Sequence, residues 1–197
     1  MININKKFET ITRKVRLCGL KDVMFDRYAG DNNTKLTPGQ KFYLAPTGSP
    51  HIGLPGLNIM SFLSAHNTNS APKRLRDKRK YKDICNACLS FVSIGQQFIP
   101  FTRDGKPIEF GEFVEDRDEL SGAYIHRTVA RLEKGIPNPK ERPVLPTPWD
   151  LEFDLTVFPN NEIKEQEIIN LFQEGGLAIG LGTFRGVFGK FKIDKWE

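Results

Sequence analysis

The sequence has few residues of the kinds that hold metals, form disulfides or carry out covalent catalysis. It contains three cysteines and three histidines among 197 residues. An odd number of cysteines, with no apolar leader in residues 1–7, argues against a secreted disulfide framework and predicts a reducing, cytoplasmic compartment. A continuous apolar run of about eighteen residues is also missing, so we expect no membrane-spanning helix.

Catalytic motifs are missing as well. The chain has no Walker loop, HExxH, GxSxG or Ser-His-Asp spacing, so we expect a protein without a cofactor that is not an enzyme. Cys85 and Cys88 form a CxxC, but a zinc site needs two more ligands, and no second CxxC or HxxxH is present. We interpret both cysteines as core residues of a helix, with metal binding as the alternative.

Charge is segregated along the chain. The net charge is +5, yet residues 73–82 alone carry +6 and residues 109–119 carry −5. Clustered cations favour nucleic acid as a partner, because each neutralised phosphate releases counterions. A solvated loop that only aids solubility is the alternative. The cations of residues 73–82, called here the basic block, are Lys73, Arg74, Arg76, Lys78, Arg79, Lys80 and Lys82.

Residues 162–197 predict a helix, a glycine-rich loop and a strand. The helix is expected to begin after Asn160-Asn161 and to end at Gly175-Gly176. Six glycines fall within residues 175–189. Main-chain amides of such a loop can form an anion-binding nest, and a nearby arginine supplies a fork for phosphate, whereas the alternative is a bulged turn beside a buried strand. The candidate binding residues are Gly180, Gly182, Phe184, Arg185, Gly186, Gly189 and Lys190.

The stretch from Ile179 to Phe191, IGLGTFRGVFGKF, resembles the C-terminal glycine-rich signature of the RAMP superfamily. Members of that superfamily are ferredoxin-like, RNA-binding proteins of CRISPR effector complexes and their relatives. Pro55-Gly56 before a helix is also similar to their backbone subunits, although residues 57–60 replace the small and basic residues usual there. The order of Arg-Pro, Trp, strand, helix and glycine loop further resembles small RAMP-like proteins of phages and mobile elements.

Periodicity elsewhere is compatible with that resemblance. Alternating residues predict strands within 8–25, 41–45 and 149–158. Five prolines within residues 135–148 predict a connection or an arm, because proline cannot continue a helix or a central strand. A hairpin is expected around Asp104-Gly105, and a helix is expected over residues 57–65.

Together these patterns predict an α+β protein with a ferredoxin-like (RRM-like) βαββαβ core and a C-terminal glycine-rich loop. Residues 1–197 would form a single domain, with insertions at about 26–50, 66–97 and 102–148.

We therefore predict non-catalytic binding of single-stranded nucleic acid, largely independent of sequence and with RNA favoured over DNA. The sheet and the glycine loop would form the floor of the site, and the basic block would form a cationic wall. Phe184 or Tyr81 would stack on bases, with Arg127 and Arg131 as further contacts. The resemblance implies a repeating subunit of a CRISPR-like ribonucleoprotein, and the two charged blocks would suit a head-to-tail homo-oligomer.

Two other functions remain open at this point. The first is a protein-interaction or structural module of a phage or mobile element that mimics an effector subunit. The second is a metal-independent endoribonuclease, an activity used by the processing branch of the same superfamily. His126, or alternatively His51, would be its catalytic residue, with Arg127 or Lys134 stabilising the phosphorane.

Overall fold

The computed structural model describes residues 9–31, 33–66, 70–115, 122–131 and 137–197, with backbone alone for residues 130 and 131. The predictions made for residues 1–7, for Lys134 and for residues 116–119 lie outside this described part. Within it, no helix is both long and apolar enough to cross a membrane.

A large antiparallel sheet forms the base of the molecule. Its strands are β1 (Ile11–Gly19), β3 (Tyr43–Leu44), β4 (Ile52–Pro55), β5 (Val92–Ile94), β6 (Phe98–Arg103), β7 (Lys106–Pro107), β10 (Asp150–Val157) and β11 (Phe191–Trp196). They pair in the order β11-β1-β10-β6-β4-β3, with β5 on β10 and β7 on β6. The predicted alternation of the strand before the last helix is confirmed, since Leu151, Phe153, Leu155 and Val157 of β10 are all buried.

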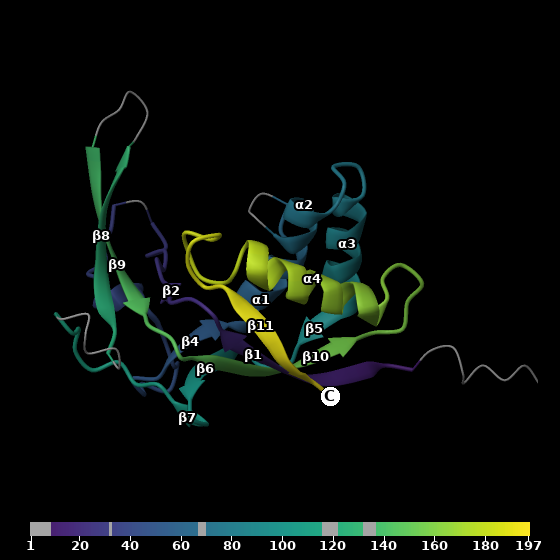
Figure 1. Ribbon diagram of the computed structural model, residues 1–197, viewed down its shortest axis with the longest axis horizontal. Helices are drawn as coiled ribbons and strands as arrows, with labels where there is room; N and C mark the ends of the chain where they lie inside the picture. The colour runs from purple at the N-terminus through teal and green to yellow at the C-terminus, as the bar shows by residue number, and fades with distance from the viewer. Residues whose placement is uncertain (1–8, 32, 67–69, 116–121, 132–136) are drawn as a thin grey trace, which may run out of the picture.

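Helices cover one face of this sheet (Figure 1). They are α1 (Gly56–Ser64), α2 (Ala71–Leu75), α3 (Tyr81–Phe91) and α4 (Glu165–Ala178). The rings of Phe62 in α1 and Phe172 in α4 stack with centroids 5.5 Å apart, and both contact Phe191 of β11. Large aromatic side chains dominate the burial of apolar surface, so this cluster joins the helices to the sheet.

The topology is that of an α+β protein with antiparallel sheets. Four of its strands pair in the order β11-β1-β10-β5. Helices α1 to α3 connect β1 with β5, and α4 connects β10 with β11. This order is consistent with the predicted βαββαβ core. The hairpin around Asp104-Gly105 is confirmed as β6 and β7, with both turn residues at positive φ.

A second antiparallel sheet extends to the side of the helices (Figure 1). It contains β2 (Val23–Met24), β9 (Pro137–Leu145) and β8 (Tyr124–Arg131), in that order. The proline-rich segment was predicted to be a connection or an arm, and residues 137–145 of it form strand β9 of the hairpin instead of a loop connection. Its prolines at positions 137, 139 and 143 are even numbers of residues apart, so their nitrogens share one edge of the strand.

The edge of β9 that carries the proline nitrogens forms few hydrogen bonds to a neighbouring strand. It faces β2, which pairs with β9 only at Val144 and Leu145. Pro143 still uses its carbonyl, which accepts a hydrogen bond from the Phe25 amide at 3.0 Å. The prolines therefore leave the long pairing of β9 with β8 intact, because the donors for that pairing lie on the other edge.

Helix α4 differs from the sequence prediction at both ends. Asn160 Oδ1 accepts hydrogen bonds from the amides of Glu162 and Ile163, which closes a turn before the helix instead of capping it. At the other end the helix continues through Gly175 and Gly176 to Ala178. The left-handed residue that follows it is Gly180, with φ of 79°.

Gly175 and Gly176 serve close packing instead of helix termination. A Cβ atom on Gly175 would lie 2.5 Å from Cζ of Phe62, and one on Gly176 would lie 2.5 Å from the main-chain oxygen of Phe191. Only glycine allows the helix to approach α1 and β11 this closely.

Glu165 links α4 to the two neighbouring strands β1 and β11. Its Oε1 atom accepts hydrogen bonds from Arg13 Nε at 2.6 Å and from Trp196 Nε1 at 2.7 Å. The hydrogen bond from Arg13 holds the pKa of the Glu165 carboxyl below its ordinary value. The ionised carboxylate therefore stabilises the packing of the helix on the sheet.

Gly176→Ala is expected to destabilise the protein. In an open helix the change would gain about 1 kcal/mol, but crowding against the Phe191 backbone costs about 1–3 kcal/mol. Urea denaturation should therefore show a lower midpoint. The control is Gly111→Ala, because its Cβ would meet no atom within 4 Å. A midpoint for Gly176→Ala at or above that of the wild type would contradict the tight packing.

The stability should also depend on the ionisation of Glu165. Because its pKa is lower in the folded state, the stabilisation is present above the unfolded value near 4.5 and is lost as the pH falls through the folded pKa. Glu165→Gln should reduce stability at neutral pH and flatten its decline in acid, as measured by urea denaturation across this range. Glu162→Gln, at an exposed position just before the helix, should retain the wild-type pH profile. A profile for Glu165→Gln as steep as that of the wild type would contradict this role.

Candidate nucleic-acid interface

The segment from Ile179 to Lys190, called here the glycine loop, joins α4 to β11. In Figure 1 it lies between the β8–β9 hairpin and the helices. Gly180, Gly182, Gly186 and Gly189 all have φ between 70° and 92°. The loop therefore needs these glycines for its backbone path.

The amides of the glycine loop are largely used within the chain. Leu181 donates to the carbonyl of Gly189 at 2.9 Å, and Gly186 donates to that of Ile179 at 2.6 Å. Thr183 and Gly189 donate to carbonyls of the β1–β2 region at 2.8 Å and 2.7 Å. These bonded amides are not available to a phosphate, and anion binding by the other amides of the loop stays a prediction.

Side chains of the loop and of the hairpin form a row of three rings. The Phe184 ring lies 6.1 Å from that of Phe188, which lies 5.4 Å from the His126 ring on β8. Phe184 is 56% exposed and has φ of 53°, a conformation that costs a non-glycine residue about 1–3 kcal/mol. Strain of this kind is typical of binding sites, and here it presents a ring to solvent. We call Phe184, Phe188 and His126 the aromatic row.

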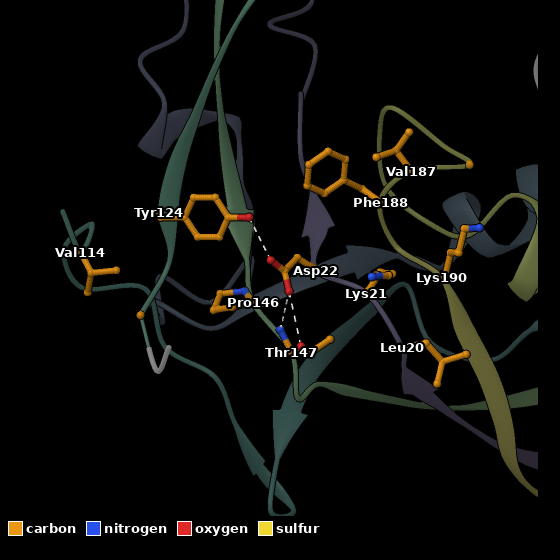
Figure 2. Close-up of a pocket in the computed structure, with 12 residues that line it drawn as sticks. Leu20, Lys21, Asp22, Val114, Tyr124, Pro146, Thr147, Val187, Phe188 and Lys190 are labelled. Carbon is orange, nitrogen blue, oxygen red and sulfur yellow. Dashed lines mark hydrogen bonds between the residues drawn. The ribbon is translucent and has the colours of Figure 1, made fainter. Parts of the chain in front are cut away.

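Two lysines lie close to this row. Lys21 and Lys190 line the same cavity as Phe188 (Figure 2). Neither makes an ion pair or a side-chain hydrogen bond with any residue of the described chain. Arg185 differs, because its Nε donates to the Gly182 carbonyl at 3.2 Å and its burial lowers the pKa of the guanidinium. It braces the loop internally, and a contact of Arg185 with phosphate remains a prediction.

The basic block occupies α2, the turn after it and the start of α3. Lys73 donates to the His66 carbonyl at 2.8 Å. Besides Lys73, the exposed cations of the block without a carboxylate partner in the described chain are Arg74, Lys78, Arg79, Lys80 and Lys82. Tyr81, the predicted stacking alternative, is half-buried with its ring 6.3 Å from that of His66.

Arg76 was predicted to contact nucleic acid with the rest of the basic block, but two carboxylates of α4 hold its guanidinium. Its Nε donates to Glu167 at 2.7 Å and its Nη1 donates to Glu174 at 2.8 Å, both on α4. These hydrogen bonds raise the pKa of Arg76 and lower that of Glu174. The guanidinium therefore holds α2 against α4, and its donors are not free for a phosphate.

The hairpin contributes fewer free cations than predicted. Arg127 pairs with Glu141 across the strands at 3.0 Å, although both side chains are exposed and such a pair is weak. Arg142 is held by Asp26 at 2.7 Å. The side chain of Arg131 lies outside the described residues. Because neighbouring strand residues point to opposite faces, Arg127 does not stand beside His126. The predicted pair of His126 with Arg127 is therefore not assembled, and the alternative with Lys134 lies outside the described residues.

The sheet was predicted to form the floor of a binding site, and its central strands β1 and β10 carry paired charges on the open face. Arg16 binds Asp150 at 2.8 Å, and Lys14 binds Glu152 at 3.0 Å. The side chains of β1 and β10 on this face include no aromatic residue, and both strands are fully described. This part of the open face, with paired charges and no rings, offers little to a single strand, and the sheet as the floor of a site stays a prediction.

The cysteines lie in the core, as predicted. Cys85 and Cys88 are buried on α3, and burial raises the pKa of the Cys88 thiol to about 12. Among the described residues, no group of three His, Cys, Asp or Glu side chains could hold a metal ion. His51 is elsewhere, with Nε2 at 3.3 Å from Glu109.

Sequence reasoning did not identify Asp22, Lys21 or Tyr124 as site residues. Asp22 accepts hydrogen bonds from the Tyr124 hydroxyl at 2.9 Å and from the Thr147 amide at 3.0 Å. These residues come from three separate segments, and no local motif marks them. Phe188 was also missed, although its place in the phenylalanine- and glycine-rich signature was a signal.

Arg76→Ala is expected to lower the free energy of unfolding by about 1–3 kcal/mol, because it leaves two carboxylates without their hydrogen-bond donor. Arg74→Ala, two residues earlier in an exposed position, is the control and should change stability little. Urea denaturation of both variants provides the measurement. Equal effects of the two changes would show that Arg76 has no special role in joining α2 to α4.

No protein-family model matches this sequence, and no curated protein is similar to it. Among solved structures, the fold is similar to a chain in the cryo-electron microscopy structure of the Type III-B Cmr-beta complex bound to cognate target RNA. The TM-score is 0.58 at 11% sequence identity. The match covers 96% of this chain but only 60% of that chain. At this identity, the similarity shows a shared fold alone.

Proposed function

We propose that this protein binds single-stranded RNA, largely independently of sequence, as a RAMP-like subunit of a CRISPR-type ribonucleoprotein. Its core would be ferredoxin-like, in one domain with the insertions set out above. Two independent features support this assignment. The chain has the superfamily's glycine-rich signature before its last strand, and its fold is similar to a chain of an RNA-bound Cmr complex.

The aromatic row is the single observation that carries the binding proposal. Proteins that bind single strands without sequence preference stack successive bases on aromatic side chains, because every base has a π-face. Phe184, Phe188 and His126 supply rings at centroid separations of 6.1 Å and 5.4 Å. The Phe184 ring is held in solvent by a left-handed backbone, and among the rings of the described residues it pairs with Phe188 alone.

Cations on both sides of the row would hold the sugar–phosphate chain. Lys21 and Lys190 stand at the loop, and the exposed part of the basic block stands on the helices. Charge attraction of this kind is independent of sequence and falls steeply with salt. RNA is favoured over DNA because the structurally similar chain belongs to a complex bound to RNA.

Other subunits of the ribonucleoprotein, or further copies of this chain, would be its protein partners. The charge segregation between the basic block and the acidic residues that follow β7 is compatible with head-to-tail contacts.

Phe184→Ala is expected to weaken binding of a fluorescent single-stranded RNA about fivefold or more, because stacking contributes about 1–3 kcal/mol per base. Fluorescence anisotropy at low salt is the measurement, with single-stranded DNA tested in parallel. Leu177→Ala is the matched control, since Leu177 is also 56% exposed and lies at the end of α4. Absence of any affinity of the wild type at low salt would refute the proposed function.

The basic block should set how steeply the affinity for single-stranded RNA falls with salt. A variant with Lys78, Arg79 and Lys80 all changed to alanine is expected to reduce the slope of log affinity against log salt by about 2, because each contact with a single strand contributes about 0.7. The control changes Lys106, Lys164 and Lys192 to alanine, which removes the same charge from exposed sites elsewhere. Identical slopes for the two variants would mean that the block makes no phosphate contacts.

A further inference from the structure

A cavity opens beside the aromatic row, and no motif in the sequence marks it. Its volume is about 670 Å³, within the range of about 300–1,000 Å³ typical of small-ligand sites. Figure 2 shows its walls, which come from the β1–β2 connection, Val114 after β7, the start of β8, the segment before β10 and the glycine loop.

The walls of this cavity are held by hydrogen bonds between distant segments. The Asp22 carboxylate stands among Tyr124 and Thr147 and accepts a hydrogen bond from each (Figure 2). Its main-chain oxygen accepts the amide of Gly189 at 2.7 Å, and the Leu20 amide donates to the carbonyl of Lys190 at 2.7 Å. The cavity is therefore built into the native structure.

The lining combines an apolar surface with excess positive charge. Phe188, Val187, Leu20 and Pro146 supply rings and aliphatic groups. The charged residues that line it are Lys21, Lys190 and Asp22, so one positive charge is left uncompensated. The two ammonium groups make no ion pair with the described chain. A ligand that suits this lining has a planar apolar part and an anionic group.

We propose that this cavity receives one unstacked base of the bound strand, with the adjoining phosphate on Lys21 and Lys190. The inference rests on the proposed function and names a subsite within it. Phe188 belongs both to the aromatic row and to the cavity wall, so a strand stacked along the row passes the cavity opening. A base that leaves the stack at Phe188 exchanges stacking for burial against the apolar wall.

The test scans a single abasic site through each position of a short oligoadenylate RNA and measures affinity by anisotropy. Wild-type protein should lose about fivefold or more in affinity at the position that enters the cavity, as well as at the stacked positions. Leu20→Trp fills the cavity from a side chain that is 43% exposed and is not part of the aromatic row. In that variant the penalty at one position should disappear, while the penalties at the stacked positions persist.

Leu44→Trp is the control, because Leu44 is 40% exposed and lies on β3, away from the cavity. If intact RNA binds and Phe184→Ala weakens that binding, but Leu20→Trp leaves every penalty unchanged, the cavity proposal is refuted and the proposed function survives.

A free nucleotide would have the same chemistry as a base with its adjoining phosphate. An NMR titration with adenosine monophosphate alone tests this other source. Perturbed resonances of Tyr124 and Lys190 together with an unchanged abasic scan would assign the cavity to a free nucleotide and overturn the proposal.

Discussion

The close contact of α4 with β11 and α1 is the constraint on which the candidate interface depends. Gly176 lets the helix approach the main chain of Phe191, and Gly175 lets it approach the ring of Phe62. The end of α4 and the start of β11 are thereby fixed, and the glycine loop must connect them. The loop does so by bonding to the β1–β2 region through Thr183 and Gly189, which brings its aromatic residues beside the hairpin.

Glycines and aromatic residues of this loop therefore have different roles. The glycines provide left-handed backbone and close approach, and their amides satisfy carbonyls of the same chain. Between them, the ring of Phe184 is 56% exposed and that of Phe188 is half-buried beside it. The glycine-rich stretch thus fixes the position of these rings through its own main-chain hydrogen bonds. Because β1 and β10 carry paired charges on the open sheet face, we place the proposed site at the loop and the hairpin instead.

The cations likewise have two roles: some bind carboxylates within the fold, and others are available to bind a ligand. Arg13, Arg16, Arg76 and Arg142 each bind carboxylates, which suits the planar guanidinium fork. The lysines at the glycine loop, and most of the basic block, have no carboxylate partner in the described chain. Net charge alone does not separate these two groups, because a paired cation contributes little to the field that a phosphate meets.

Local patterns in the sequence determined the elements whose signals are local: the alternation of β10, the helix after Pro55, the Asp104-Gly105 turn and the helical cysteines. The C-terminal signature also located the loop that holds the aromatic row. Tertiary structure decided where α4 ends, how the prolines of β9 share one edge, that Arg76 binds α4, and that Asp22, Tyr124 and Thr147 meet around a cavity. These features depend on contacts between residues far apart in the chain, and periodicity carries no information about such contacts.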